Sequence, residues 1–163
     1  PPPPTSQTSA ASDVYKRQFI TSIVGRYNLK SDLVEIANAG HQPALLRNGN
    51  KFIEFSSSSV PLAVTKHKDQ SVYKLESFNL NGGRIYCFTD GFSECMNEKK
   101  QEIGISGVKE LIIKHQNSSL KKELENATEE IRLRSLKKGM TEKGIKENND
   151  ILDDDLTIIG IGK

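Results

Sequence analysis

The carboxylate of Asp90 stands at a place in the sequence where chemistry is plausible. It follows residues 85–88, an apolar and aromatic run that predicts a buried strand, and it precedes Gly91, which permits a tight turn. A carboxylate held at the exit of a buried strand suits a hard divalent cation such as Mg²⁺, which prefers oxygen ligands. The alternative is that Asp90 only caps the short helical turn that follows, and the Asp-Gly pair taken alone favours this cap.

A second acidic group, residues 153–155, directly precedes the apolar, β-branched run 156–161. Adjacent carboxylates raise one another's pKa unless a cation or a hydrogen-bond donor compensates them. An exposed acidic loop, in which water compensates the charge, is the alternative for this group alone. Two strand boundaries that both carry Asp in one small domain favour a shared metal site.

The elements that must position these carboxylates are a run of strands, then two helices and a last strand. Short runs with strand patterning are separated by turn residues such as those at 48–50, and helical spacing begins only beyond residue 104. The pattern predicts an α+β fold with strands that are mostly antiparallel. The predicted strands are 19–27, 33–37, 43–47, 51–55, 72–80, 84–88 and 156–161, and the predicted helices start near Ser106 and span 119–138. The first helix is expected to bury Val108, Leu111 and Ile112 as an apolar stripe, and the Lys and Glu residues of the second helix are expected to form a solvated face. The last strand is apolar on both faces and is expected inside a sheet, whereas Arg84 is expected to face solvent.

Length, charge and composition argue against a nucleic-acid-binding or membrane-spanning protein segment. The chain has 163 residues, which suits one domain, and a net charge of +2 with mixed signs, so a nucleic-acid partner is not expected. No apolar run is long enough to span a bilayer, so direct membrane contact is not expected from this segment. Cys87 and Cys95 lack metal-ligand spacing and read as buried free thiols in a reducing, cytoplasmic setting.

Residues 1–18 are expected to lie outside the fold. They contain a run of four prolines followed by Thr, Ser, Gln and Ala, with almost nothing apolar to bury. We expect them to be a disordered tail that is not native to the protein.

Five segments, in this order, resemble the PPM-type metal-dependent serine/threonine phosphatases, in their bacterial SpoIIE-like branch. Several motifs in register are far more specific than any one of them, and the resemblance covers residues 19–163. The segments are F-I-T at 19–21, N-A-G-H-Q-P-A-L-L at 38–46, V-P-L-A-V at 60–64, Y-C-F-T-D-G-F-S-E-C-M-N at 86–97 and D-D-L-T at 154–157.

The resemblance implies a fold and an expected extent. The family's domain is an α-β-β-α sandwich of two mostly antiparallel sheets flanked by helices. It begins with two further acidic motifs upstream of the F-x-T strand, and nothing before Phe19 matches them. Residues 19–163 are therefore expected to be the C-terminal part of such a domain, truncated at its N-terminal side.

The resemblance also implies an activity, which is the hydrolysis of phosphoserine or phosphothreonine on a regulatory protein such as an anti-sigma-factor antagonist. Two Mg²⁺ or Mn²⁺ ions in the complete domain would activate water for this reaction. Asp90 and Asp154 match the family's catalytic metal-ligand positions, Asp155 is a further candidate ligand, and Glu94 and Thr157 are expected to support the geometry. The expected partners are a phosphoprotein substrate and an upstream sensor domain. This chain by itself is expected to be poorly active.

Two other functions stay open at this point. The chain could be a pseudo-phosphatase that binds a phosphoprotein without cleaving it, or an ordinary α+β interaction domain whose acidic turns are solvated. His41, which follows Ala-Gly at a strand end, could contact substrate or orient a carboxylate. A structural role with backbone partners is the favoured prediction for it.

Overall fold

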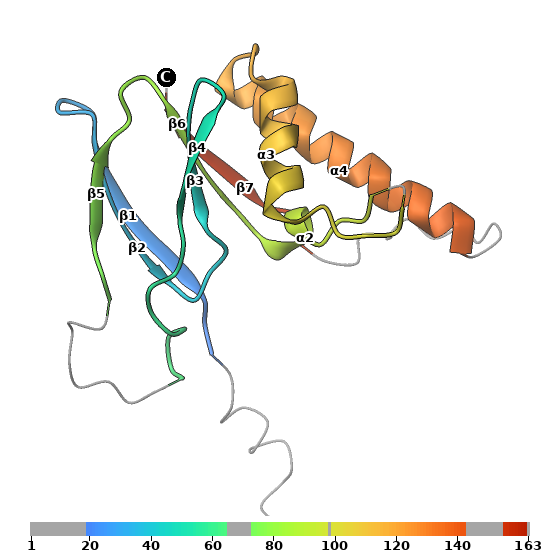
Figure 1. The fold of residues 1–163 in the computed structure, drawn as a ribbon, viewed down its shortest axis with the longest axis horizontal. Coiled ribbons are helices and arrows are strands. Elements are labelled where there is room, and N and C mark those ends of the chain that lie inside the picture. The colour runs from blue at the N-terminus through green and yellow to red at the C-terminus, as the bar shows by residue number, and fades with distance from the viewer. Residues whose placement is uncertain (1–18, 65–72, 98, 143–154, 163) are drawn as a thin grey trace, which may run out of the picture.

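A computed structural model describes residues 19–64, 73–97, 99–142 and 155–162 of the chain. In it two antiparallel sheets lie face to face, and helices cover the outer face of one sheet (Figure 1). The predicted tail at residues 1–18 lies outside the described residues, as does Asp154.

The first sheet has three strands in the order β1-β2-β5, with bounds β1 Ser22–Asn28, β2 Leu33–Ala39 and β5 Glu76–Asn79. β1 and β2 form the predicted hairpin, in which Gly25 pairs with Ile36 and Tyr27 with Val34. Val34 and Ile36 are buried at alternate positions, because successive side chains of a strand point to opposite faces. One face of this sheet therefore belongs to the core.

The second sheet has four strands in the order β4-β3-β6-β7, with bounds β3 Ala44–Asn48, β4 Lys51–Phe55, β6 Arg84–Phe88 and β7 Ile158–Gly162. Its inner face closes the core between the sheets, where the rings of Phe55 and Phe78 stack with centroids 4.2 Å apart. The buried members of this core are Val34, Ile36, Ala44, Leu46, Phe55, Leu80 and Ile85.

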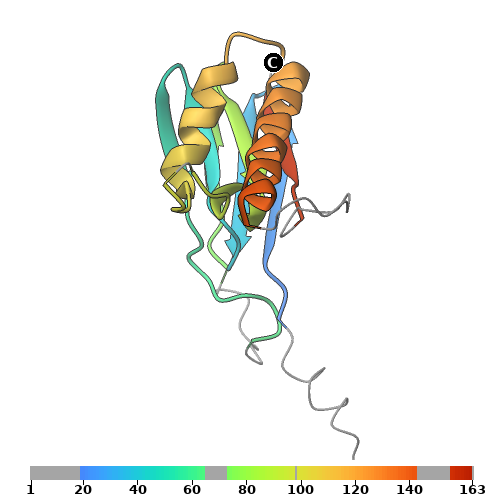
Figure 2. The same ribbon diagram turned by 90° about the vertical axis from the view of Figure 1, so that its right-hand side faces the viewer.

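The outer face of the four-stranded sheet is covered by α3 (Gly104–His115) and α4 (Leu120–Glu142), which lie side by side across it (Figure 2). The predicted apolar stripe of α3 is confirmed, since its three members are buried. Ser119 caps α4, because its Oγ accepts the Lys122 N–H at 3.4 Å. A second core lies between these helices and the four-stranded sheet. Its buried members are Leu45, Tyr86, Phe88, Phe92, Cys95, Val108, Leu111, Ile112, Ala127 and Ile131. The expected class, α+β with two antiparallel sheets and helices, is confirmed, and in the described part of the chain the helices cover the four-stranded sheet.

The position predicted for the last strand is wrong. Among the described strands β7 pairs only with β6, so it forms an edge of the sheet rather than its interior. Ile159, which shares the inward face with Ile85 and Cys87, is consequently 57% exposed. The apolar pattern was read correctly, but a pattern cannot tell which strands lie beside it.

The prediction that Arg84 faces solvent is also wrong. Its guanidinium forms an ion pair with Glu123 of α4, a carboxylate that is completely buried. Tyr86 donates a hydrogen bond from its hydroxyl to the same carboxylate at 2.7 Å, and Arg47 Nη2 lies 3.6 Å from it. Glu123 does not belong to the solvated face expected for the charged residues of this helix.

Both cysteines are free thiols, as predicted. Burial raises the pKa of the half-buried Cys87, so its thiol stays protonated at neutral pH. No helix among the described residues is long and apolar enough to cross a bilayer.

Candidate functional site

The ends of β6 and β7 bring the two acidic segments together. In the antiparallel β6–β7 pair, Phe88 is opposite Ile158, so the residues that follow β6 lie beside those that precede β7. The pairing continues one step past the strands, where the Thr89 N–H donates to the Thr157 carbonyl at 3.0 Å. Asp90 and Asp155, although far apart in sequence, therefore share one end of the sheet.

Thr89 fastens this junction with its side chain. Its hydroxyl donates to the Asp155 carbonyl at 2.7 Å and accepts the Thr157 N–H at 3.0 Å. Because a hydroxyl can donate and accept at once, one side chain satisfies two backbone groups of the arriving segment. The approach of residues 155–157 is thus fixed by hydrogen bonds before β7 begins.

Gly91 allows the two segments to approach closely. A Cβ atom at this position would lie 2.8 Å from the Asp155 carbonyl oxygen and 3.1 Å from Leu156 Cδ2. The first distance is shorter than a non-bonded carbon–oxygen contact, so a side chain here would push residue 155 away from the end of β6. The glycine predicted for a turn serves this close approach instead.

Asp90 is the first residue of α2 (Asp90–Ser93), a single turn anchored by the fully buried Phe92. Thr89 occupies the N-cap position, and no side chain caps the helix. The alternative in which Asp90 caps this turn is therefore wrong. The Asp90 carboxylate is exposed and makes no hydrogen bond or ion pair to another described residue, so it is available to a ligand.

The donor set at this end fits a hard divalent cation in kind. Asp90 and Asp155 are both exposed aspartates, and Mg²⁺ and Mn²⁺ prefer carboxylate oxygens. In number the fit is partial, because no group of three or more His, Cys, Asp or Glu side chains with metal-site spacing occurs among the described residues. Glu94, expected to support the geometry, is exposed one residue beyond α2.

His41 lies in the loop between β2 and β3. This loop is at the same end of the sandwich as Asp90, because β3 is antiparallel to β6 and its start lies toward the end of β6. One ring nitrogen, Nδ1, lies 3.0 Å from the Thr21 hydroxyl, and the backbone N–H donates to Asn38 Oδ1 at 2.9 Å. The ring partner is thus a side chain rather than the backbone partner that was predicted.

Asn38 holds this loop in place. Its side chain is 7% exposed, and its amide nitrogen donates to the carbonyls of His41 at 3.3 Å, Gln42 at 3.1 Å and Phe55 at 3.3 Å. The sequence showed the motif but gave no role to this Asn or to Thr89. The signal that could have revealed both is a polar residue two positions before a loop glycine, as for Asn38, or directly before a strand-end aspartate, as for Thr89.

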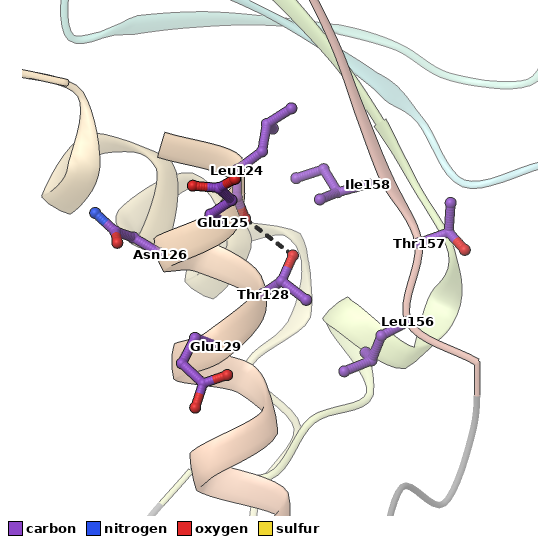
Figure 3. Close-up of a pocket in the computed structure, with 8 residues that line it drawn as sticks. All are labelled: Leu124, Glu125, Asn126, Thr128, Glu129, Leu156, Thr157 and Ile158. Carbon is purple, nitrogen blue, oxygen red and sulfur yellow. Dashed lines mark hydrogen bonds between the residues drawn. The ribbon is translucent and has the colours of Figure 1, made fainter. Parts of the chain in front are cut away.

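A groove of about 650 Å³ lies next to the acidic end, between α4 and the segment that enters β7 (Figure 3). Leu156 and Ile158 point toward α4, whereas Thr157 between them points away. Glu125 and Glu129 give the groove an acidic rim. Asp90 and Asp155 do not line it, so the groove and the carboxylates are separate features.

Comparisons with known proteins agree on the fold. The SiaA-PP2C domain of Pseudomonas aeruginosa matches with a TM-score of 0.62 at 16% identity, over 86% of this chain and 50% of that one. The RsbU and RsbW domains of Rv1364c from Mycobacterium tuberculosis match with a TM-score of 0.55 at 19% identity, over 86% of this chain and 35% of that one.

A third structure, the PP2C phosphatase domain with a fragment of the regulatory domain of SpoIIE from Bacillus subtilis, matches with a TM-score of 0.55 at 16% identity. The match extends over 88% of this chain and 37% of that one. The chain thus spans half or less of each of these three structures. No curated protein matches it in sequence. The family described as stage II sporulation protein E (SpoIIE) matches residues 6–162, and the chain therefore belongs to the SpoIIE family of PP2C-like phosphatase domains.

Proposed function

We propose that this chain is part of a metal-dependent phosphatase that removes phosphate from phosphoserine or phosphothreonine on a regulatory protein. The observation that carries the proposal is the convergence of Asp90 with the segment that begins at Asp155, fastened by Thr89 at one end of the sheet. Strand pairing accounts for the backbone bond between the two turns, whereas the two bonds of the Thr89 hydroxyl are additional and hold residues 155–157 at the end of β6 that carries Asp90. A cation bound by both acidic segments would require them to be held together in this way.

Asp90 would hold a Mg²⁺ or Mn²⁺ ion together with Asp154 and Asp155, and the complete domain would hold two such ions. When bound, the ions supply Lewis-acid activation of water and offset the negative charge of the phosphoryl group. The chain's own part is to keep its carboxylates aligned before the cation arrives. The buried Phe92 fixes the start of α2, and Gly91 permits the close approach of residue 155.

The substrate we propose is a phosphorylated regulatory protein, such as an anti-sigma-factor antagonist, in the cytoplasm. The support is the family, together with the neighbour from M. tuberculosis, whose name joins an RsbU domain to an RsbW domain. An upstream sensor domain would then control the phosphatase.

Phosphate release from a phosphoserine protein, with Mn²⁺ and with a chelator, tests the proposal. The printed chain is compared with a longer form that carries the family's two upstream acidic motifs. We expect turnover only in the longer form, because two described carboxylates cannot neutralise two divalent cations. Asp90→Asn should abolish that turnover, while Glu110→Gln, at an exposed carboxylate of α3, should leave it unchanged.

Strong Mn²⁺-dependent turnover by the printed chain would contradict the expectation that the upstream motifs supply part of the metal ligands. A longer form that binds the phosphoprotein tightly but releases no phosphate would identify a pseudo-phosphatase, and the proposed reaction would then be wrong. Absence of Mn²⁺ binding in both forms would favour the plain interaction domain.

A further inference from the structure

Thr89 makes more contacts to the acidic segment than any strand pairing requires. Its hydroxyl donates to the Asp155 carbonyl at 2.7 Å and accepts the Thr157 N–H at 3.0 Å, and its own N–H donates to the Thr157 carbonyl at 3.0 Å. The third bond continues the β6–β7 ladder. The two bonds of the hydroxyl are additional, and one of them reaches two residues further, to the backbone carbonyl of Asp155.

Burial does little to hold residues 155–157 in this position. Asp155 and Thr157 are exposed, and only the half-buried Leu156 packs against the second core. Regular pairing has already ended, because Phe88 and Ile158 form the last pair of the two strands. The backbone of residues 155–157 is held at the end of β6 by hydrogen bonds, and the Thr89 hydroxyl makes two of them.

We infer that Thr89 is a positioning residue of the candidate metal site, an inference that rests on the proposed function. It touches neither cation nor substrate, and it acts through the backbone of Asp155 and Thr157. By fixing this segment, its hydroxyl removes conformational freedom that the carboxylates would otherwise lose on cation binding. Residues that orient the ligands of a metal in this way typically change its affinity by about 10–100-fold when they are replaced.

Hydrogen exchange in the metal-free chain tests the structural half of the inference. Thr89→Val keeps the shape of the side chain but removes the hydroxyl, so the Thr157 N–H loses its acceptor and should exchange roughly tenfold faster. Thr89→Ser keeps the hydroxyl and should preserve the slow exchange. An unchanged exchange rate in Thr89→Val would overturn the inference without bearing on the metal.

Mn²⁺ binding, measured by the paramagnetic broadening of amide signals, tests the other half. We expect Thr89→Val to bind Mn²⁺ about 10–100-fold more weakly than the native chain, and Thr89→Ser to bind it nearly as well. Thr128→Val is the matched control, since the hydroxyl of Thr128 donates only within α4, to the Leu124 carbonyl at 2.9 Å. It should leave Mn²⁺ affinity unchanged.

Equal Mn²⁺ affinity in Thr89→Val and the native chain would overturn the positioning role while the metal site stands. If the printed chain binds Mn²⁺ too weakly to measure, the same variants are compared in the longer form that carries the upstream acidic motifs. A longer form that protects the Thr157 N–H and still binds no Mn²⁺ would instead refute the proposed metal-dependent function. The positioning role would fall with it, and the bonds of Thr89 would be purely structural.

Discussion

Removing the buried charge of Glu123 should destabilise the chain more than any exposed substitution. Its carboxylate is completely buried and faces two cations, Arg84 in direct contact and Arg47 with Nη2 at 3.6 Å. Tyr86 adds a hydrogen bond from its hydroxyl at 2.7 Å, and burial together with this bond raises the pKa of Tyr86 to about 12. One side chain of α4 thereby joins the helix to β3 and β6.

The magnitude follows from what Glu123→Gln leaves behind. The amide keeps the size of the side chain, but both guanidinium groups lose their counter-charge while their side chains stay 10% and 16% exposed. Breaking a buried ion pair from one side costs about 3–5 kcal/mol. Against a typical total of about 5–15 kcal/mol, this is a large share of the free energy of unfolding. The melting temperature should fall by about 10 °C.

Urea unfolding of the metal-free chain measures this loss. The matched control is Glu125→Gln on the same helix, whose ion pair with Lys121 is 3.8 Å long and lies between side chains that are 87% and 61% exposed. That pair should contribute less than about 0.5 kcal/mol. A double-mutant cycle with Tyr86→Phe should show a coupling of about 0.5–3 kcal/mol. If Glu123→Gln lowers the free energy of unfolding no more than Glu125→Gln does, solvent screens the charges around Glu123 and the reasoning is wrong.

Two further substitutions test the site and the helix pair. In Gly91→Ala the new Cβ would lie 2.8 Å from the Asp155 carbonyl oxygen. This substitution should therefore weaken Mn²⁺ binding and lower the free energy of unfolding by about 1–3 kcal/mol. Unchanged Mn²⁺ affinity in a titration would contradict this expectation. Glu130→Gln should flatten the acid limb of the stability curve. Burial alone would raise the pKa of Glu130, but hydrogen bonds from three partners lower it from 4.5 to about 2, so its contribution is complete above pH 4.5 and is lost as the pH falls toward 2. Urea unfolding at several pH values measures this contribution, and equal slopes for both chains below pH 4.5 would refute it; the three partners are Lys114, Arg134 and His115.

Local patterns were sufficient for most of the elements. Residues 51–55 form a strand with the predicted bounds, and Val108, Leu111 and Ile112 form the buried stripe of α3 as predicted. Strand alternation and helical spacing are properties of neighbouring residues, so the sequence carries them directly. The fold class followed from the order of these elements, and the family followed from motifs whose residues are close together.

The candidate site could be predicted only in part from the sequence, and strand pairing in the tertiary structure completed it. The sequence identified Asp90 and Asp155 as carboxylates at strand boundaries, and the turn at Gly91 between strand and helix. A shared site required the strand before Asp90 and the strand after Asp155 to lie together, and β6 and β7 do pair. The sequence did not reveal which residues face each other, because pairing joins residues more than 60 positions apart through backbone groups that every sequence possesses. Thr89 acquires its two extra hydrogen bonds only through that pairing.

Burial was decided by the tertiary structure alone. Arg84 and Glu123 look like solvated charges in the sequence, since Arg84 follows an Asn-Gly-Gly turn, Glu123 follows two lysines, and nothing local marks a partner. Glu123 is buried and Arg84 is largely shielded from solvent because the four-stranded sheet places α4 over β6, where the two side chains form an ion pair. Conversely, Ile159 looks like a core residue and is 57% exposed, because its strand has only one described neighbour. Sequence determined which residues could pair or pack, and the arrangement of the sheets and helices determined which of them did.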